Sequence, residues 1–461
     1  MPQSSQSSLQ QHFKAPAGFF NFTTLTGLST EPRLFAFGEE LTGYGCARAE
    51  EQDLLDAVEV ADGVCRLPFD PEEVFANLRM ERYPIEGNTA SLKQTIVRLS
   101  YYTLRPLLPV SVRKYAQRRA LRGWDKPGFP GWPVERTVEG FMEKLLALAM
   151  KAVGVDSIPF IWFWPDGKRG CLLMTHDVET EAGLRACGDL MSLNESFGIY
   201  SSFQVIPTGR YNAQPEDLAG MRRRGFEVNV HDWNHDGHLF RTRERFVERA
   251  AKINARAAEW QTIGFRSAAL YRNVDWLREL NFEYDMSIPT TGRLDPQHGG
   301  CCTLMPWMNG DLLEIPVTTI QDYSLFHILN QYSVDVWHRQ TDGILAHHGM
   351  ASYIVHPDYI QTPQARQCYT ELLSYLAGLR DNTGAWAALP AQVNQWWRER
   401  AQMTLENSNG EWRVSGPGSE RASVAFARLE GTSIVYTFAN PAASAPVPTS
   451  QLNNSRGDAH A

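Results

Sequence analysis

The pattern of hydrophobic and polar positions is most regular between about residue 158 and about residue 400. Short apolar runs there predict strands at 160–164, 170–175, 200–206, 226–230, 262–266, 312–317, 352–356 and 385–389. Apolar residues at helical spacing predict the intervening helices at 181–196, 216–224, 244–259, 274–280, 334–348, 364–379 and 391–401. Strands that alternate with helices are typical of a parallel sheet with crossover helices. We therefore predict an α/β fold for residues 156–400, and the many repeats favour a (β/α) barrel over an open doubly wound sheet.

The flanking regions follow other patterns. Residues 1–155 mix short apolar runs with acidic stretches, which predicts a mixed α/β accessory region. Within it, 91–122 carries eight Lys or Arg residues and no acid, and its prolines predict two helices rather than one. This basic segment either packs against the main domain or contacts an anionic surface such as a membrane. After residue 400, alternating runs predict a small β appendage at 401–440, and 441–461 has the composition of a disordered tail.

Composition narrows the classes of function. Asp and Glu outnumber Lys and Arg by 52 to 44, giving a net charge of −8, which argues against nucleic acid as a partner. No Gly-rich phosphate loop follows a predicted strand, so a nucleotide-binding fold is not indicated. Neither a secretory signal in 1–19 nor an apolar stretch of 18 residues is visible. The seven cysteines are scattered, which favours reduced thiols, and we expect a cytoplasmic protein.

Two acidic side chains lie just past one predicted strand. Asp177 and Glu179 follow the apolar run 170–175. In an extended chain, residues i and i+2 face the same side, so both carboxylates can point into one pocket. Two carboxylates in a pocket repel each other unless a cation or a proton separates them. We expect one to bind a metal and the other to handle protons.

Two histidines follow the strand predicted at 226–230. The four-residue spacing of His231 and His235 predicts two imidazoles on the same side of a helical turn, close enough to share one divalent ion. A carboxylate from a neighbouring strand end would complete a site of two histidines and one carboxylate, with open positions for water and substrate.

Arg266 and His356 end two further predicted strands. A guanidinium at a strand end can hold a catalytic carboxylate ionised and oriented. A histidine at an equivalent position can give a proton to a leaving amine or alcohol. The active sites of barrels occupy the carboxyl ends of their strands, so these groups are expected to meet there.

The ordered motifs resemble those of a known family. Thr-His-Asp-Val-Glu at 175–179, His231-x-x-x-His235, Arg266 and Ile-Val-His-Pro at 354–357 resemble the polysaccharide deacetylases of carbohydrate esterase family 4, the NodB-type domain. The resemblance covers about 240 residues. It implies a distorted (β/α) barrel of the polysaccharide deacetylase type, with a mixed α/β extension before it and a small β appendage after it. Val178 stands where the family usually has a second aspartate, and Ser267 where it usually has proline.

The resemblance also implies roles for individual residues. Some members of the family carry an acid-Val-acid pattern, and on that pattern Glu179 joins His231 and His235 as a metal ligand. The cofactor would be a divalent metal, with Zn²⁺ as the first choice. Asp177 would be the base that activates water, Arg266 would orient that base, and His356 would be the general acid.

The function implied is metal-dependent hydrolysis of acetyl groups on an N- or O-acetylated saccharide. Because we expect a cytoplasmic protein, the substrate is expected to be a soluble or lipid-linked precursor. The basic segment 91–122 would then suit peripheral contact with the inner face of a membrane. Two alternatives stay open: a catalytically decayed carbohydrate-binding or scaffold protein, and a hydrolase of another linear or cyclic amide.

Overall fold

The computed structural model describes residues 7–24, 34–37, 40–43, 52–53, 58–83, 123–125 and 128–438. They form two compact units. The first unit takes its described residues from 1–78, 137–167 and 396–461, and the second from 79–136 and 168–395. The basic segment 91–122 and the tail 441–461 lie outside the described residues.

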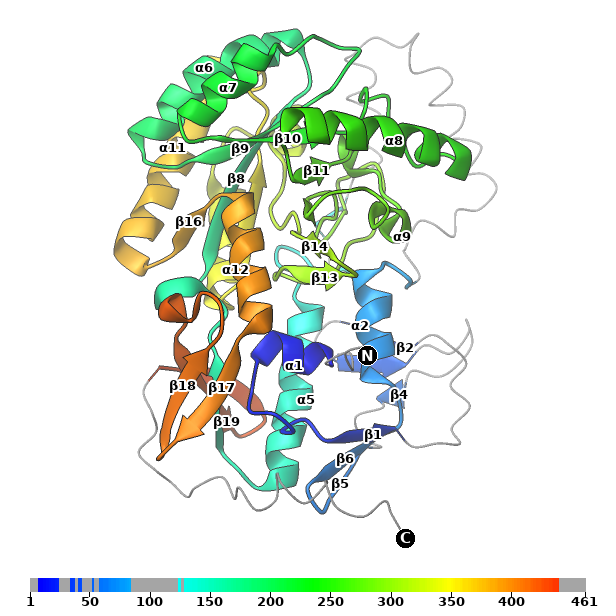
Figure 1. The fold of residues 1–461 in the computed structure, drawn as a ribbon, viewed down its shortest axis with the longest axis vertical. Coiled ribbons are helices and arrows are strands. Elements are labelled where there is room, and N and C mark those ends of the chain that lie inside the picture. The colour runs from blue at the N-terminus through cyan, green and yellow to red at the C-terminus, as the bar shows by residue number, and fades with distance from the viewer. Residues whose placement is uncertain are drawn as a thin grey trace. The chain divides into compact units, whose positions relative to one another are not determined.

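The second unit is built on a sheet of nine strands (Figure 1). They are β8 (Cys171–Val178), β9 (Ser201–Val205), β10 (Glu227–His231), β11 (Gly264–Arg266), β12 (Tyr284–Asp285), β13 (Trp307–Asn309), β14 (Leu312–Glu314), β15 (Met350–Ile354) and β16 (Trp386–Ala388). Their order is β13-β14-β12-β11-β10-β9-β8-β15, and β16 pairs with the first part of β8. All these pairings are parallel except that of β13 with β14.

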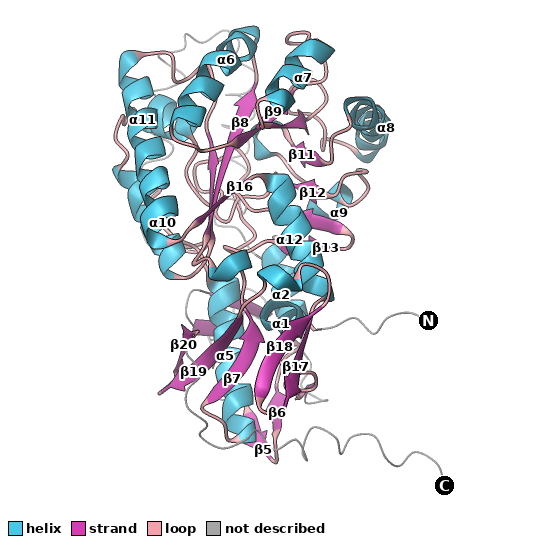
Figure 2. Cartoon of the chain, turned by 60° about the vertical axis from the view of Figure 1, so that its left-hand side comes forward, coloured by secondary structure: helices cyan, strands magenta, loops and turns pink. Residues whose placement is uncertain are grey.

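Helices cover the sheet as crossover connections, and Figure 2 shows α6, α10 and α11 on one side of the strands. The helices of this unit are α6 (Glu181–Ser196), α7 (Pro215–Arg223), α8 (Arg243–Trp260), α9 (Val274–Leu277), α10 (Asp335–Ala346) and α11 (Pro363–Gly378). A 3₁₀-helix, η4 (Ala268–Leu270), and two π-helices, η5 (Tyr323–Leu329) and η6 (Leu379–Thr383), also belong to this unit. Helix α12 (Pro390–Gln402) contains the boundary between the two units. The predicted α/β class is confirmed, and the sheet is a curled half-barrel, in agreement with the distorted barrel that was expected.

Local sequence explains where the helices begin. Thr180, Thr242 and Thr362 precede α6, α8 and α11, and each hydroxyl accepts a hydrogen bond from the backbone N–H three residues later. Such a cap satisfies one of the N–H groups that a helix start leaves free, and it contributes about 1 kcal/mol. Along α6 the buried side chains recur at helical spacing, from Gly183 to Asn194, so one face packs on the sheet.

The core lies between the sheet and these helices. Strand β8 is buried at all eight positions, as expected for a central parallel strand covered on both faces. Its neighbours contribute Phe203, Val230 and Phe265, each fully buried, and α10 contributes Trp337. Burying a side chain of this size contributes about 1.5–3 kcal/mol relative to exposure. This packing fixes the strands whose carboxyl ends carry the candidate site.

Between β14 and β15 the barrel is joined by single hydrogen bonds rather than by a strand ladder. The Thr318 hydroxyl donates to the carbonyl of Met350 at 2.7 Å, and the N–H of Ser352 donates to that hydroxyl at 2.8 Å. The N–H of Thr319 donates to the carbonyl of Ser352 at 3.2 Å. Residues just past β14 are therefore held against β15.

The first unit combines distant segments. Its helices are α1 (Ser8–Phe13), α2 (Pro71–Arg79) and α5 (Thr137–Val153). The last residue of α2 belongs to the second unit. Its short 3₁₀ segments are η3 (Pro165–Gly167) and η7 (Ser419–Arg421). Its strands are β1 (Phe22–Thr24), β2 (Leu34–Phe37), β3 (Glu40–Gly43), β4 (Gln52–Asp53), β5 (Glu59–Ala61), β6 (Val64–Leu67), β7 (Ser157–Ile161), β17 (Thr404–Ser408), β18 (Glu411–Ser415), β19 (Val424–Glu430) and β20 (Ser433–Thr437). They form sheets β1-β6-β5, β2-β3-β4, β17-β18 and β20-β19-β7.

One strand is placed differently from the prediction. The run at 160–164, expected as the first strand of the barrel, appears as β7 and pairs antiparallel with β19. The backbone hydrogen bonds of β7 to β19 are therefore made within the first unit. The segment boundaries at 155 and 400 stay predictions. Among the described helices, none is both long and apolar enough to cross a membrane.

Candidate active site

Four strands, β8, β10, β11 and β15, bring the candidate residues to one edge of the second unit's sheet. Asp177 is the penultimate residue of β8, His231 ends β10 and Arg266 ends β11. His356 lies two residues past the end of β15. Because these strands are parallel, their carboxyl ends meet at the same edge, as the sequence predicted.

Glu179, His231 and His235 form a group with the composition of a metal site. Their ligand atoms all lie within 4.8 Å of one another. Glu179 Oε1 is 2.7 Å from His235 Nε2 and 3.8 Å from His231 Nε2. All three side chains are mostly buried, with exposed fractions of 16%, 0% and 9%.

The hydrogen bonds of the histidines suit this set of donors. His231 Nδ1 lies 3.1 Å from the carbonyl oxygen of Arg266, which can only accept, so Nδ1 carries the proton and Nε2 keeps its lone pair. His231 Nε2 and His235 Nδ1 are buried and have no hydrogen-bond partner within the described part of the chain. Buried polar atoms without partners are costly, and a divalent cation between the imidazoles would remove part of that cost.

The backbone between the two histidines corrects the sequence prediction. Residues after His231 form bends rather than a helical turn. Asp232 and His235 both adopt positive φ, 56° and 54°, a region rarely populated by residues other than glycine. These two left-handed residues fold the chain back and bring the imidazole rings to a centroid distance of 4.8 Å. The histidines converge as predicted, but through a tight loop.

Arg266 holds Asp177. Its Nη1 donates to Asp177 Oδ1 and to the Thr175 hydroxyl, both at 2.7 Å, and its Nε donates to the carbonyl of Met286 at 3.0 Å. Burial raises the pKa of Asp177, but the positive charge of Arg266 and the nearby histidines outweigh burial and lower that pKa below its ordinary value. The second oxygen, Oδ2, lies 3.8 Å from His231 Nε2. Asp177 is therefore a carboxylate at neutral pH with one oxygen directed at the metal group.

Asp322 holds His356, and the sequence analysis missed it. Its Oδ1 lies 2.7 Å from His356 Nδ1, and its Oδ2 accepts from the N–H of His356 at 2.7 Å. His356 Nε2 is 3.4 Å from Glu179 Oε1. Burial lowers the pKa of His356, but the carboxylates of Asp322 and Glu179 outweigh it and raise that pKa well above its ordinary value. An acidic residue a few positions past the run 312–317, at another strand end, was the signal available in the sequence.

The structure explains the two departures from the family's motifs. The side chain of Val178 is fully buried within the hydrophobic core, so that position faces away from the metal group. The N–H of Ser267 donates to the Ser287 hydroxyl at 2.8 Å, and that hydroxyl donates to Asp285. A proline at 267 has no N–H for this bond. Asp285, which also accepts from the N–H of Ser287, supports this loop.

His176 belongs to the motif but not to the site. Its Nδ1 donates to the carbonyl of Val355 at 2.9 Å, and its Nε2 accepts from the Asn194 amide at 3.0 Å. Burial lowers the pKa of His176 to about 4, so the ring is neutral. Both nitrogens are used, which leaves neither for a metal.

Comparison with known proteins gives structural likenesses only. No protein family and no curated protein matches the sequence. Among solved structures, the chain is similar to a protein described as a polysaccharide deacetylase from Mycobacterium smegmatis, with 18% identity, a TM-score of 0.42, and coverage of 54% of this chain and 98% of that one. The chain is similar in structure to polysaccharide deacetylases. A second similar structure is that of a peptidoglycan deacetylase, PdaC from Bacillus subtilis, with 15% identity, a TM-score of 0.31, and coverage of 51% of this chain and 95% of that one. The allantoinase PuuE is also similar, with 14% identity, a TM-score of 0.42 and coverage of 51% and 92%.

Proposed function

We propose that the second unit is a metal-dependent hydrolase that removes acetyl groups from an N- or O-acetylated saccharide. One observation supports the proposal most directly: two carboxylates lie near the same imidazole, and they have different hydrogen-bond partners. Asp177 Oδ2 and Glu179 Oε1 both lie 3.8 Å from His231 Nε2, yet only Asp177 is bonded to Arg266. The order of the sequence motifs resembles that of carbohydrate esterase family 4, and we infer deacetylation as the reaction from this resemblance.

Glu179, His231 and His235 would hold a divalent cation, with Zn²⁺ as the first choice. When bound, such an ion polarises a carbonyl group and lowers the pKa of water. The charges of the site agree with this. Arg266 is paired with Asp177 and His356 with Asp322, so the carboxylate of Glu179 leaves one negative charge beside the two imidazoles, which a cation would balance. Two imidazoles and one carboxylate also leave coordination positions for water and substrate.

Asp177 acts as the base in this scheme. Arg266 occupies Oδ1 and fixes the plane of the carboxylate, so Oδ2 is the oxygen that accepts a proton from the attacking water. The same guanidinium keeps the carboxylate ionised in a buried setting. Positioning and charge therefore come from one residue, Arg266, which ends β11, three strands along the sheet from β8.

His356 acts as the acid. Its Nδ1–H is bonded to Asp322, which directs Nε2 toward the side where Glu179 lies. Since the Asp322 carboxylate raises the pKa of His356, the ring favours its protonated form, and Nε2 can pass a proton to the departing nitrogen or oxygen. Asp322 touches neither substrate nor metal in this scheme, and it acts as a positioning residue through His356.

The experiment compares acetate release by the purified full chain before and after chelation, and after Zn²⁺ is restored. N-acetyl sugars, O-acetyl sugars, lipid-linked acetylated sugars and a cyclic amide are offered in parallel. We expect chelation to abolish acetate release and Zn²⁺ to restore it. Full acetate release by metal-free protein would overturn the proposal, and turnover of the cyclic amide alone would replace the substrate class.

The variant Asp177→Asn separates an enzyme from a decayed binding protein. An enzyme loses most turnover but keeps its metal, because Asp177 is not a ligand, whereas a binding protein is unaffected. The matched control is Asp381→Asn, which changes an exposed aspartate paired with Arg380. Unchanged acetate release in Asp177→Asn would exclude this residue as the base.

A further inference from the structure

The loop that brings His235 back toward His231 has an unusual backbone conformation. Within this loop, which comprises residues 232–238 and is called the metal loop below, Asp232, His235 and Gly237 have positive φ, of 56°, 54° and 72°. Residues other than glycine rarely adopt this region, and they stay there only where the surrounding structure holds them. The place of His235 in the metal group therefore depends on the contacts of the metal loop.

Neighbouring segments pack closely against the metal loop. At Gly209, between β9 and α7, an added Cβ atom would lie 3.4 Å from the Cβ of Asn234. At Gly237, an added Cβ atom would lie 3.2 Å from the ring of Tyr271. Contacts of this kind restrict the loop, and hydrogen bonds add direction to that restraint.

Two arginine side chains from different segments bind the metal loop at consecutive residues. Arg210, between β9 and α7, donates from Nη2 to the carbonyl of His235 at 3.0 Å. Arg249 on α8 donates to both carboxylate oxygens of Asp236, each at 2.6 Å, and its side chain is only 12% exposed. A pair with two parallel hydrogen bonds fixes the relative orientation of its partners. The chain is therefore held at His235 and at the residue that follows it.

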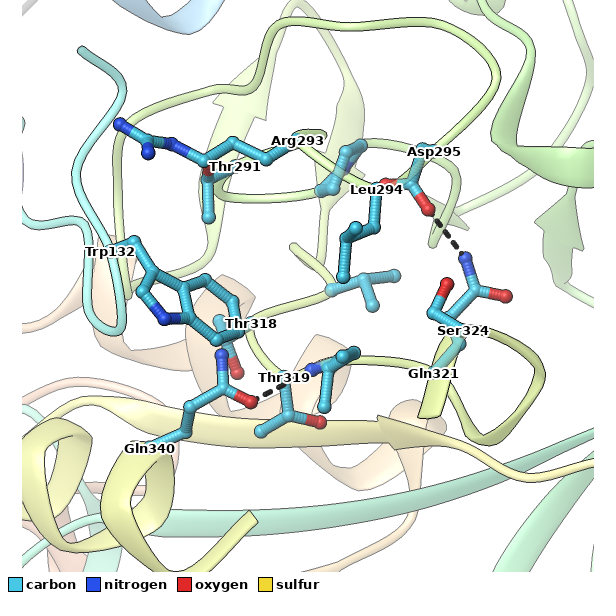
Figure 3. Close-up of a pocket in the computed structure, with 13 residues that line it drawn as sticks. Trp132, Thr291, Arg293, Leu294, Asp295, Thr318, Thr319, Gln321, Ser324 and Gln340 are labelled. Atoms are coloured by element: carbon cyan, nitrogen blue, oxygen red, sulfur yellow. Dashed lines mark hydrogen bonds between the residues drawn. The ribbon is translucent and has the colours of Figure 1, made fainter. Parts of the chain in front are cut away.

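The segment that positions the proposed acid is held by a neutral group instead. Gln321, next to Asp322, donates from Nε2 to Asp295 Oδ1 at 2.9 Å (Figure 3). The metal loop is bound by two cations, although a positive charge near a divalent cation repels it. If these arginines favour metal binding, they must do so through the geometry that they impose on the loop.

We infer that Arg210 and Arg249 are positioning residues that hold His235 in the geometry that binds the metal. Both act through hydrogen bonds to the metal loop, and neither touches the metal or the substrate. The inference rests on the proposed function, since His235 is assigned there as a metal ligand. Residues that support metal ligands typically contribute about 10–100-fold to metal affinity.

The sign of the change in Zn²⁺ affinity tests this role. Competition with a chelating dye measures the affinity of the purified full chain for Zn²⁺. Arg210→Gln and Arg249→Gln are each expected to weaken Zn²⁺ binding by about tenfold, because the loop is no longer held. If charge were their only effect, removing a cation would strengthen binding. The matched control is Arg243→Gln, which removes a comparable two-bond pair with Glu279 from the same helix and is expected to leave the affinity unchanged.

Two further variants separate geometry from charge at Arg249. Arg249→Lys keeps the charge but cannot make two parallel bonds to Asp236, so it is expected to weaken Zn²⁺ binding as well. Asp236→Asn and the double variant Arg249→Gln with Asp236→Asn are expected to lose about as much affinity as Arg249→Gln, because all three break the same contact. Charge alone would instead return the double variant to wild-type affinity.

Unchanged or tighter Zn²⁺ binding in Arg210→Gln and Arg249→Gln would overturn the inference. Thermal unfolding of the metal-free variants shows that they fold, and a lower affinity in a folded variant supports the positioning role. Weakened Zn²⁺ binding in a protein that releases no acetate would refute the proposed deacetylation and leave the positioning role standing. A wild-type chain that does not bind Zn²⁺ would overturn both.

Discussion

Replacing Asp322 by asparagine tests the assignment of His356 as the acid. The Asp322 carboxylate accepts three hydrogen bonds, each 2.7 Å long, from His356 Nδ1, the N–H of His356 and the N–H of Tyr323. Asparagine offers one oxygen and one NH₂ group in the same space. At least one of the three donors must then face another donor, and the negative charge beside the imidazole is lost.

The size of the effect follows from these contacts. Leaving one buried donor without a partner costs about 1–3 kcal/mol in the free energy of unfolding. General acid catalysis contributes about 10²–10⁴-fold to rate, so we expect kcat to fall by about a hundredfold with little change in KM. Because the carboxylate raises the pKa of His356, its removal lowers that pKa. The basic limb of the pH profile of kcat therefore moves to lower pH.

The assay is initial acetate release as a function of pH, together with thermal unfolding and metal content. Asp381→Asn serves as the control for the loss of one carboxylate at an exposed position. A lower kcat at every pH, with no displacement of the basic limb, would assign Asp322 a purely structural role. Wild-type kcat in Asp322→Asn would remove His356 from the mechanism.

Three further predictions address the metal group, the loop after β11 and the first unit. Glu179→Gln replaces an anionic ligand by a neutral amide, and we expect the affinity for Zn²⁺ to fall more than about tenfold. Competition with a chelating dye measures this affinity, and an unchanged value would contradict the ligand assignment. Ser267→Pro removes the N–H that donates to Ser287, and we expect the free energy of unfolding in urea to fall by about 1 kcal/mol or more, whereas a stabilised variant would show that this bond contributes nothing. Burial, and then the charge of Arg400, lowers the pKa of Lys14 from 10.5 to about 8. The unfolded chain therefore binds more protons between pH 8 and 10.5, so stability increases with pH across this range, and Lys14→Met is expected to remove that increase. At pH 7 the gain from removing a buried charge is reduced, because methionine cannot donate the 2.7 Å hydrogen bond that Lys14 Nζ gives to the carbonyl of Ala401. A pH dependence that survives in Lys14→Met would assign it to another group.

The sequence predicted the elements of the second unit well because their patterns are strong. Helix α6 occupies Glu181–Ser196, the predicted range, since Thr180 caps its start and its apolar spacing is regular. By contrast, β12 (Tyr284–Asp285) and β13 (Trp307–Asn309) were not predicted. Strands of two or three residues are too short to show a period, and they are defined by pairing with neighbours.

The candidate site was predicted as a set of residues but not as a geometry. The motif order gave Asp177, His231 and His356, and the structure brings them to one edge. The loop that turns His235 back toward His231 depends on positive φ at two residues that are not glycine, which no periodicity shows. Asp322 lies 34 residues before His356, and its role depends on a tertiary hydrogen bond that no local pattern contains.

The direction of proton transfer in the site depends on which partner holds each of two aspartates, Asp177 on β8 and Asp322 just before η5. Asp177 is bonded to a guanidinium that cannot lose its proton, so its carboxylate is kept ready to accept one. Asp322 is bonded to an imidazole, and the proton stays on the ring rather than on the acid. The pKa of Asp177 is lowered while that of His356 is raised, and opposite shifts of this kind assign base and acid within one pocket. If Arg266 were paired with His356 and Asp322 with Asp177, the pocket would keep the same charges but would lose its direction of proton transfer. The order in which β8, β11 and β15 end at this edge of the sheet therefore contributes to the chemistry.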